Sequence, residues 1–136
     1  MQLNHSRKHN GTAVCPFMEA WLLLFFIEMV MLFRSSASLR QTIATQAVAI
    51  KAQKQSRVEV LSRVMDLACV FYFKRVLCLQ RSAATTLFMR RHGVHAQMVA
   101  GAQILPPEFH AWVEVDGTVV NDKPYMHEIY QILERH

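Results

Sequence analysis

The sequence predicts an α+β domain in which N-terminal helices pack on a small antiparallel sheet. Residues 17–92 contain neither glycine nor proline, whereas residues 93–124 hold three of the four glycines and three of the four prolines. Helices tolerate these residues poorly, and turns between strands need them. Near residue 93 the apolar spacing also changes, from steps of three and four to steps of two. With 136 residues, 52% of them hydrophobic, the chain suffices for one packed domain.

The chain begins with a polar segment, residues 1–16, which we expect to be a flexible tail. The single domain, 17–136, then divides into a helical half, 17–77, and a core of one helix plus antiparallel strands, 78–136. The periodic apolar residues predict four helices, at 17–33, 37–53, 57–74 and 78–91.

Residues 17–33 are the most apolar stretch of the chain. A membrane-spanning helix needs about 20 apolar residues with few charges. This run is shorter and contains Glu19 and Glu28. We therefore expect a buried or interfacial helix, and membrane insertion or export is the alternative.

The third and fourth predicted helices have the clearest signals. In the third, apolar residues recur at helical steps, namely Val58, Leu61, Val64, Met65, Ala68, Phe71 and Tyr72. The fourth ends in Arg90, Arg91 and His92, followed by Gly93. Cations in the last turn with a glycine after it are typical of a helix C-terminus.

Strands are expected at 94–100, 109–115 and 118–121, followed by a short closing helix at 125–136. Asp116-Gly117 is a hairpin signal. Side chains alternate along a strand. Four residues of 109–115 should therefore face the core, Phe109, Ala111, Val113 and Val115, and three the other side, His110, Trp112 and Glu114.

The formal net charge is +5, and the positive charge is concentrated in the helical part. Eleven basic and two acidic residues lie between Arg34 and Arg91. Such a surface attracts nucleic acid, anionic lipid or an acidic peptide, or is simply a solvated helix face. The chain has no aromatic-basic motif and no helix-turn-helix signature, so we expect no nucleic-acid partner.

The three cysteines, Cys15, Cys69 and Cys78, form no CxxC pair, and their number is odd. This usage indicates free thiols in a reducing compartment, so we expect a cytoplasmic location. The sequence shows no grouping of four well-spaced metal ligands. We therefore expect neither a metal nor another cofactor.

Cys78 is the candidate nucleophile. It stands at the predicted start of helix 78–91, close in sequence to Lys74, Arg75 and Arg81. A helix N-terminus and nearby cations both stabilise a thiolate, which is the nucleophilic form of cysteine. The alternative is a buried structural thiol.

A nucleophilic cysteine needs a base and a third group that orients the base, and His110 and Asp122 are the candidates. The hairpin between them decides whether they meet. A two-residue loop places Asn121 on the face of His110. A three-residue loop ending at Gly117 places Asp122 directly opposite His110, with Cβ atoms about 5 Å apart. Because a glycine suits the third loop position, we choose Asp122 and keep Asn121 as the reserve.

Several segments together carry a family resemblance: CLQRS at 78–82, LFMRRHG at 87–93, HAWVEVDG at 110–117 and ND at 121–122, with EAWLLL at 19–24 as an opening helix. Together they resemble the protease of lasso-peptide biosynthesis, a member of the transglutaminase-like cysteine protease superfamily. The resemblance covers most of residues 17–123. Leu77 departs from it, since a small hydroxyl residue is expected before the nucleophile, and this changes how the helix is capped.

The resemblance implies a papain- or transglutaminase-like core with the nucleophile at a helix N-terminus. It also implies a cysteine peptidase that removes the leader from a ribosomally made lasso-peptide precursor through an acyl-enzyme intermediate. Cys78 would attack the scissile carbonyl, His110 would take and return the proton, and Asp122 would hold the imidazole. Residues 17–77 offer no strands for a peptide-binding module. The implied partners are thus the precursor, a separate leader-binding recognition protein and a lasso macrolactam synthetase.

Two further residues flank the candidate base. We expect Phe109 and Trp112 to line the substrate cleft, and simple packing is the alternative for both. Two other functions stay open: acyl transfer by the same triad, and a basic helical binding protein at a membrane or partner surface.

Overall fold

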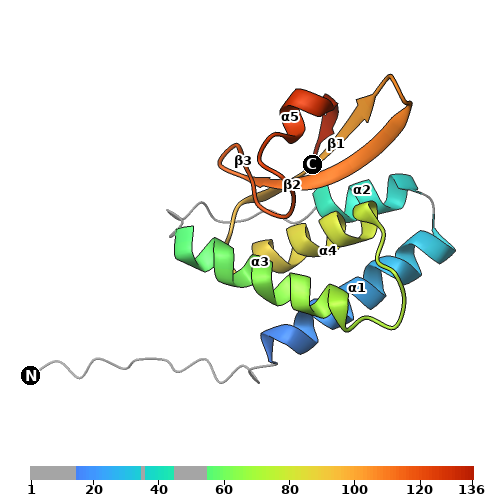
Figure 1. Ribbon diagram of the computed structural model, residues 1–136. Coiled ribbons are helices and arrows are strands. Elements are labelled where there is room, and N and C mark those ends of the chain that lie inside the picture. Colours follow the sequence, from blue (N-terminus) through green and yellow to red (C-terminus); the bar gives the residue numbers. More distant parts are fainter. Residues whose placement is uncertain (1–14, 35, 45–54) are drawn as a thin grey trace, which may run out of the picture.

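The computed structural model describes residues 15–34, 36–44 and 55–136. Helices α1 to α4 lie on one side of an antiparallel sheet, and α5 lies on the other (Figure 1). The predicted α+β class is confirmed. The elements, in chain order, are α1 Pro16–Phe33, α2 Ser36–Ala44, α3 Gln55–Val70, α4 Cys78–Arg91, β1 Ala96–Gln103, β2 Glu108–Val115, β3 Thr118–Val119, α5 Met126–Ile129 and β4 Gln131–Arg135.

The sheet has the strand order β3-β2-β1-β4. Strands β1 and β2 form a long hairpin that pairs all eight residues of each strand, from Ala96 opposite Val115 to Gln103 opposite Glu108. The short strand β3 continues from β2, and β4 returns along the free edge of β1. The sheet is thus built around the strand that carries His110.

Three of the four predicted helices appear with nearly the expected bounds. Helix α1 begins one residue earlier than predicted, at Pro16, and α4 has the predicted bounds. Helix α3 spans Gln55–Val70, and residues 71–74 form a turn and bends in place of the predicted last turn. Of the helix predicted at 37–53, α2 covers the first part, and residues 45–53 lie outside the described part of the chain, as do residues 1–14 of the predicted tail.

The closing helix predicted for 125–136 is wrong for most of its length. A single short helical segment, α5, is followed by the strand β4. Residues 131–135 include good helix formers such as glutamine, leucine, glutamate and arginine. Pairing with the open edge of β1 overrides that local preference, because it satisfies backbone groups that would otherwise be unpaired.

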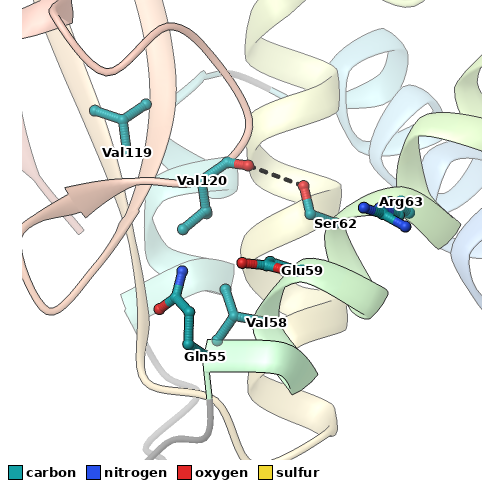
Figure 2. Close-up of a pocket in the computed structure, with 7 residues that line it drawn as sticks. All are labelled: Gln55, Val58, Glu59, Ser62, Arg63, Val119 and Val120. Carbon is teal, nitrogen blue, oxygen red and sulfur yellow. Dashed lines mark hydrogen bonds between the residues drawn. The ribbon is translucent and has the colours of Figure 1, made fainter.

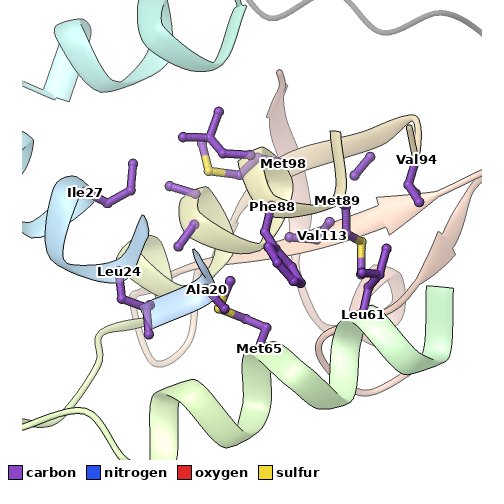
Figure 3. Close-up of a cluster of buried hydrophobic side chains, with 14 of the residues drawn as sticks. Ala20, Leu24, Ile27, Leu61, Met65, Phe88, Met89, Val94, Met98 and Val113 are labelled. Atoms are coloured by element: carbon purple, nitrogen blue, oxygen red, sulfur yellow. The ribbon is translucent and has the colours of Figure 1, made fainter. Parts of the chain in front are cut away.

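The main core lies between the helices and the sheet (Figure 3). Leu24 and Ile27 of α1, Met65 of α3 and Phe88 of α4 are almost fully buried in it. Val113 of β2 meets them from the sheet, as its alternation predicted. Phe109 was expected to join this core, but it is 77% exposed because it lies near the start of β2, on the solvent side of the hairpin end.

A second, smaller apolar cluster covers the other side of the sheet. It contains Val99 and Trp112 from the sheet and Met126 from α5, with Tyr130 packed against them. Gly101 lies under this cluster, and a Cβ atom built there would come within 2.7 Å of the Trp112 ring. No larger residue fits at this position without moving the indole.

Helix α1 is long and apolar enough to cross a membrane, by length and composition. Its two glutamates nevertheless bind residues of this domain. Glu28 is buried and accepts from the Tyr72 hydroxyl and the Lys74 ammonium group. Glu19 pairs with Arg91 at 2.5 Å, at the end of α4. The two charges thus tie α1 to the end of α4 and to the segment that follows α3.

Candidate active site

Cys78 is the first residue of α4, and its side chain is exposed. The N-cap residue Leu77 contributes no side-chain capping bond. The amide N–H groups of the first helical turn have no acceptors within a helix, so they remain available to an anion or a carbonyl oxygen. The unusual Leu77 therefore leaves the helix start open beside the thiol.

His110 and Asp122 contact each other directly. The distance between His110 Nε2 and Asp122 Oδ2 is 2.7 Å, and both side chains are roughly four-fifths buried, at 20% and 23% exposed. Partial burial alone would raise the pKa of the Asp122 carboxyl. Hydrogen bonds from His110 and from the Lys123 amide outweigh burial, so this pKa lies below its ordinary value. A carboxylate only accepts hydrogen bonds, so Nε2 is the donor in this bond and Nδ1 is the ring nitrogen left for another partner.

The hairpin turn that brings them together is not the predicted one. Val115 pairs with Thr118, so the loop has two residues, Asp116 and Gly117, both with positive φ. The three-residue loop expected before Asp122 is therefore wrong. Strand β3 ends at Val119, earlier than the predicted 118–121, and the chain then bends. Beyond the bend, strand alternation no longer decides where a side chain points.

The segment after β3 is held from two sides. The Val120 amide donates to the Val113 carbonyl, and its own carbonyl accepts from Ser62 of α3, both at 2.9 Å. Figure 2 shows this second bond beside a cavity of about 240 Å³ between α3 and the hairpin. Asn121, the reserve for orienting the imidazole, instead accepts from the Val113 amide at 2.7 Å. Asp122 is the residue that bonds His110.

Tyr130 is a residue of the site that the sequence did not indicate. Its ring stacks on the His110 imidazole, with ring centroids 5.3 Å apart and planes at 28°. Burial raises the pKa of the Tyr130 hydroxyl, and the nearby Glu108 carboxyl and the charge of Asp122 add to this. Tyr130 therefore covers the imidazole of the His110–Asp122 pair with an aromatic ring. The sequence did not indicate it because residues 125–136 were predicted as one helix, whereas Tyr130 lies between α5 and β4.

The two residues expected to line a cleft differ in their positions. Trp112 is fully buried, and its Nε1 donates to the buried Glu114 carboxylate at 2.8 Å. It has no surface to offer a substrate, so the packing alternative holds for Trp112. Phe109 lies next to His110 and is largely exposed, so it is available for contact.

A family comparison fits this arrangement. The family model described as the transglutaminase-like superfamily matches residues 21–135, which is most of the chain. The chain belongs to the transglutaminase-like superfamily. The matched residues include both Cys78, at the start of α4, and His110, on β2.

The chain is also similar to the Microcin J25-processing protein McjB of Escherichia coli. The two are 28% identical over 76 residues, which is 54% of this chain. The match covers 36% of McjB, so the aligned part of this chain corresponds to about a third of that protein. No solved structure matches the chain.

The other thiols of this superfamily member lie in different surroundings. Burial raises the pKa of the Cys69 thiol, while the neighbouring Arg81 lowers it and Asp66 raises it further. Cys69 is thus a poorer nucleophile than an exposed cysteine. Cys15 is exposed just before α1. Within the described ranges, no group of histidine, cysteine, aspartate and glutamate side chains could hold a metal ion.

Proposed function

We propose that this chain is a cysteine peptidase that removes the leader peptide from a lasso-peptide precursor. The observation that carries the proposal is the 2.7 Å bond between His110 and Asp122, on a strand packed against the helix that begins with Cys78. Membership in the transglutaminase-like superfamily supports an enzyme rather than a binding protein. The similarity to a microcin-processing protein supports a precursor peptide as substrate.

The proposed reaction uses the three side chains in sequence. The lone pair of His110 Nδ1 takes the thiol proton of Cys78, and the thiolate attacks the scissile carbonyl carbon. The first-turn amides of α4 stabilise the oxyanion. The intermediate then expels the amine, which receives the proton from His110, and an acyl-enzyme remains. Water, activated by His110, hydrolyses the thioester and releases the leader. Asp122 holds the imidazole throughout.

The partners are proposed from the resemblance to lasso-peptide proteases. Between residues 15 and 77 the described part of the chain holds three helices and no strand, so it offers no sheet edge to which a leader peptide could add as a strand. We propose that a separate recognition protein binds the leader and presents the precursor, and that a macrolactam synthetase closes the ring of the freed core peptide. Free thiols and the domain contacts of α1 support a cytoplasmic enzyme, with lipid or partner contact at the exposed side of α1.

The first experiment incubates the chain with the co-encoded precursor, with and without the recognition protein, and follows the peptide by mass spectrometry. We expect one cut between leader and core. Cys78→Ala should abolish the cut without changing thermal unfolding, because an exposed helix-start side chain contributes little packing. Cys69→Ala is the matched control and should still cut. An active Cys78→Ala variant would exclude the proposed nucleophile.

A second outcome, acyl transfer, is favoured by the superfamily description. Both reactions share the acyl-enzyme, and they differ in whether water or an amine accepts the acyl group. The same assay with a primary amine added distinguishes them. Hydrolysis leaves a free carboxylate on the leader, whereas transfer gives a leader amide that is heavier than the free acid by the mass of the amine less one water.

A further inference from the structure

A buried hydrogen-bond network lies next to each member of the proposed triad. Ser82 follows Cys78 by four residues, one helical turn, so both side chains lie on one side of α4. The Ser82 side chain is almost fully buried, and its hydroxyl donates to the Ala111 carbonyl at 2.9 Å. Ala111 is the residue after His110. The helix that carries the thiol is therefore tied to β2 beside the imidazole.

Asn121 extends the same network to the segment that carries Asp122. Its Nδ2 donates to the Ser82 hydroxyl oxygen at 3.2 Å, and its Oδ1 accepts from the Val113 amide. Asn121 is 7% exposed. Because both ends of the amide are engaged, the side chain has one favourable orientation. The backbone bends after Val119, so Asp122 lies outside the β2–β3 pairing. The side-chain bonds of Asn121 to Val113 and Ser82 hold this segment in place of strand pairing.

We propose that Ser82 and Asn121 form a positioning clamp that holds His110 and Asp122 at bonding distance beside the start of α4. One hydroxyl serves both connections, since it donates to β2 and accepts from Asn121. Its catalytic meaning rests on the proposed peptidase function. Its structural effect, which is to hold the His110–Asp122 pair, does not depend on that function. Ser82 and Asn121 are positioning residues, since they act through their bonds to the β2 backbone and to each other.

The direct measurement is the tautomer of His110, read from long-range ¹H–¹⁵N NMR spectra. In the wild-type chain, the Asp122 carboxylate should hold His110 in the Nε2–H form. Ser82→Ala removes the shared hydroxyl, so we expect a mixture of both tautomers. If Ser82→Ala does not fold, Ser82→Cys keeps the size and donates only weakly, and should show an intermediate mixture.

Thr86→Val is the matched control. Thr86 is buried one turn further along α4, and its hydroxyl donates to the Ser82 carbonyl of the same helix. Its loss should lower thermal stability without changing the His110 tautomer. With the precursor as substrate, Ser82→Ala should lower kcat by about 10- to 100-fold with little change in KM, because small misplacements of reacting groups have effects of this size. Thr86→Val should keep the wild-type kcat.

The outcomes separate the clamp from the proposed function. A wild-type tautomer in Ser82→Ala, or an equal change in Thr86→Val, overturns the clamp whether or not the precursor is cut. A tautomer change confined to Ser82→Ala in a chain that never cuts the precursor supports the clamp and counts against the peptidase.

Discussion

The Asp122 carboxylate has two hydrogen-bond donors, Nε2 of His110 at 2.7 Å and the Lys123 amide at 2.8 Å. Both favour the ionised form, and together they lower the pKa of Asp122 although partial burial opposes them. The imidazole is therefore held by a fixed negative charge at neutral pH. Catalysis by His110 should depend on that charge as well as on the shape of the side chain.

Asp122→Asn separates charge from shape. The amide fills the same space, but it can turn its NH₂ group toward His110 and favour the wrong tautomer. We expect kcat for precursor cleavage to fall by about 10²- to 10⁴-fold, the usual contribution of general acid–base catalysis. Steady-state kinetics with the precursor check this. A variant as active as the wild type would remove Asp122 from the triad.

The same substitution predicts a pH dependence of stability. The folded-state pKa of Asp122 is lowered, so its charge stabilises the fold above the ordinary carboxyl pKa of about 3.9. This contribution is lost as the pH falls through the lowered value. Urea unfolding should therefore show the wild type more stable than Asp122→Asn at neutral pH, with the difference vanishing once the pH falls below the lowered pKa. A difference that persists in acid would point to packing instead.

At the scale of elements, α5 and β4 complete the site from outside the motif region. They bring Tyr130 over the His110 ring and Met126 against Trp112. The imidazole thus lies between the sheet and an aromatic cover. A chain ending in a helix, as the sequence predicted, would leave this side of His110 open.

Tyr130 variants test this cover. Tyr130→Phe keeps the stacked ring and should retain nearly the wild-type kcat. Tyr130→Ala exposes the imidazole to water and frees it to rotate, so we expect kcat to fall about tenfold or more. Measuring precursor cleavage by both variants shows whether the ring or the hydroxyl of Tyr130 supports catalysis. Equal loss in both would assign the effect to the hydroxyl and its contact with Glu108.

The features predicted correctly from the sequence depend on local interactions, and the features that were missed depend on long-range ones. Helices α1 and α4 were predicted with almost their observed bounds, because apolar spacing and end signals are local properties. Strand β4 was missed because its stability comes from pairing with β1, about 30 residues away in sequence. The contact of His110 with Asp122 was predicted, but from a turn that the chain does not have. The bonds of Asn121 to Val113 and Ser82 produce it, and no local pattern reveals them.

At the scale of the whole molecule, α1 holds the helical layer together while leaving much of its own surface exposed. Glu28 binds Tyr72 and Lys74 beyond the end of α3. On its other side, Leu22 and Phe33 are 51% and 81% exposed. Exposed apolar side chains gathered in a large patch are typical of surfaces that contact another protein or a membrane. One side of α1 thus packs against the rest of the domain, and the other side is exposed.

Glu28→Gln tests the committed side. Hydrogen bonds from Lys74 and Tyr72 lower the pKa of Glu28, so its charge stabilises the fold above the ordinary carboxyl range and stops doing so as the pH falls through the lowered value. We expect a lower Tm at neutral pH, because the variant leaves Lys74 without its carboxylate, and no difference in acid. Thermal scans at both pH values check this. Glu59→Gln, at an exposed position on α3, should keep the wild-type Tm at both.

Gly101 carries no functional group, yet the geometry around His110 depends on it. A methyl group there would lie 2.7 Å from the Trp112 ring and 2.9 Å from the Cβ atom of Tyr130. Both rings stack near the imidazole, at centroid distances of 6.3 and 5.3 Å. In a mutational library of this chain, position 101 should therefore tolerate as little variation as the nucleophile itself. Selection for cleavage would then retain glycine at a place where no chemistry occurs.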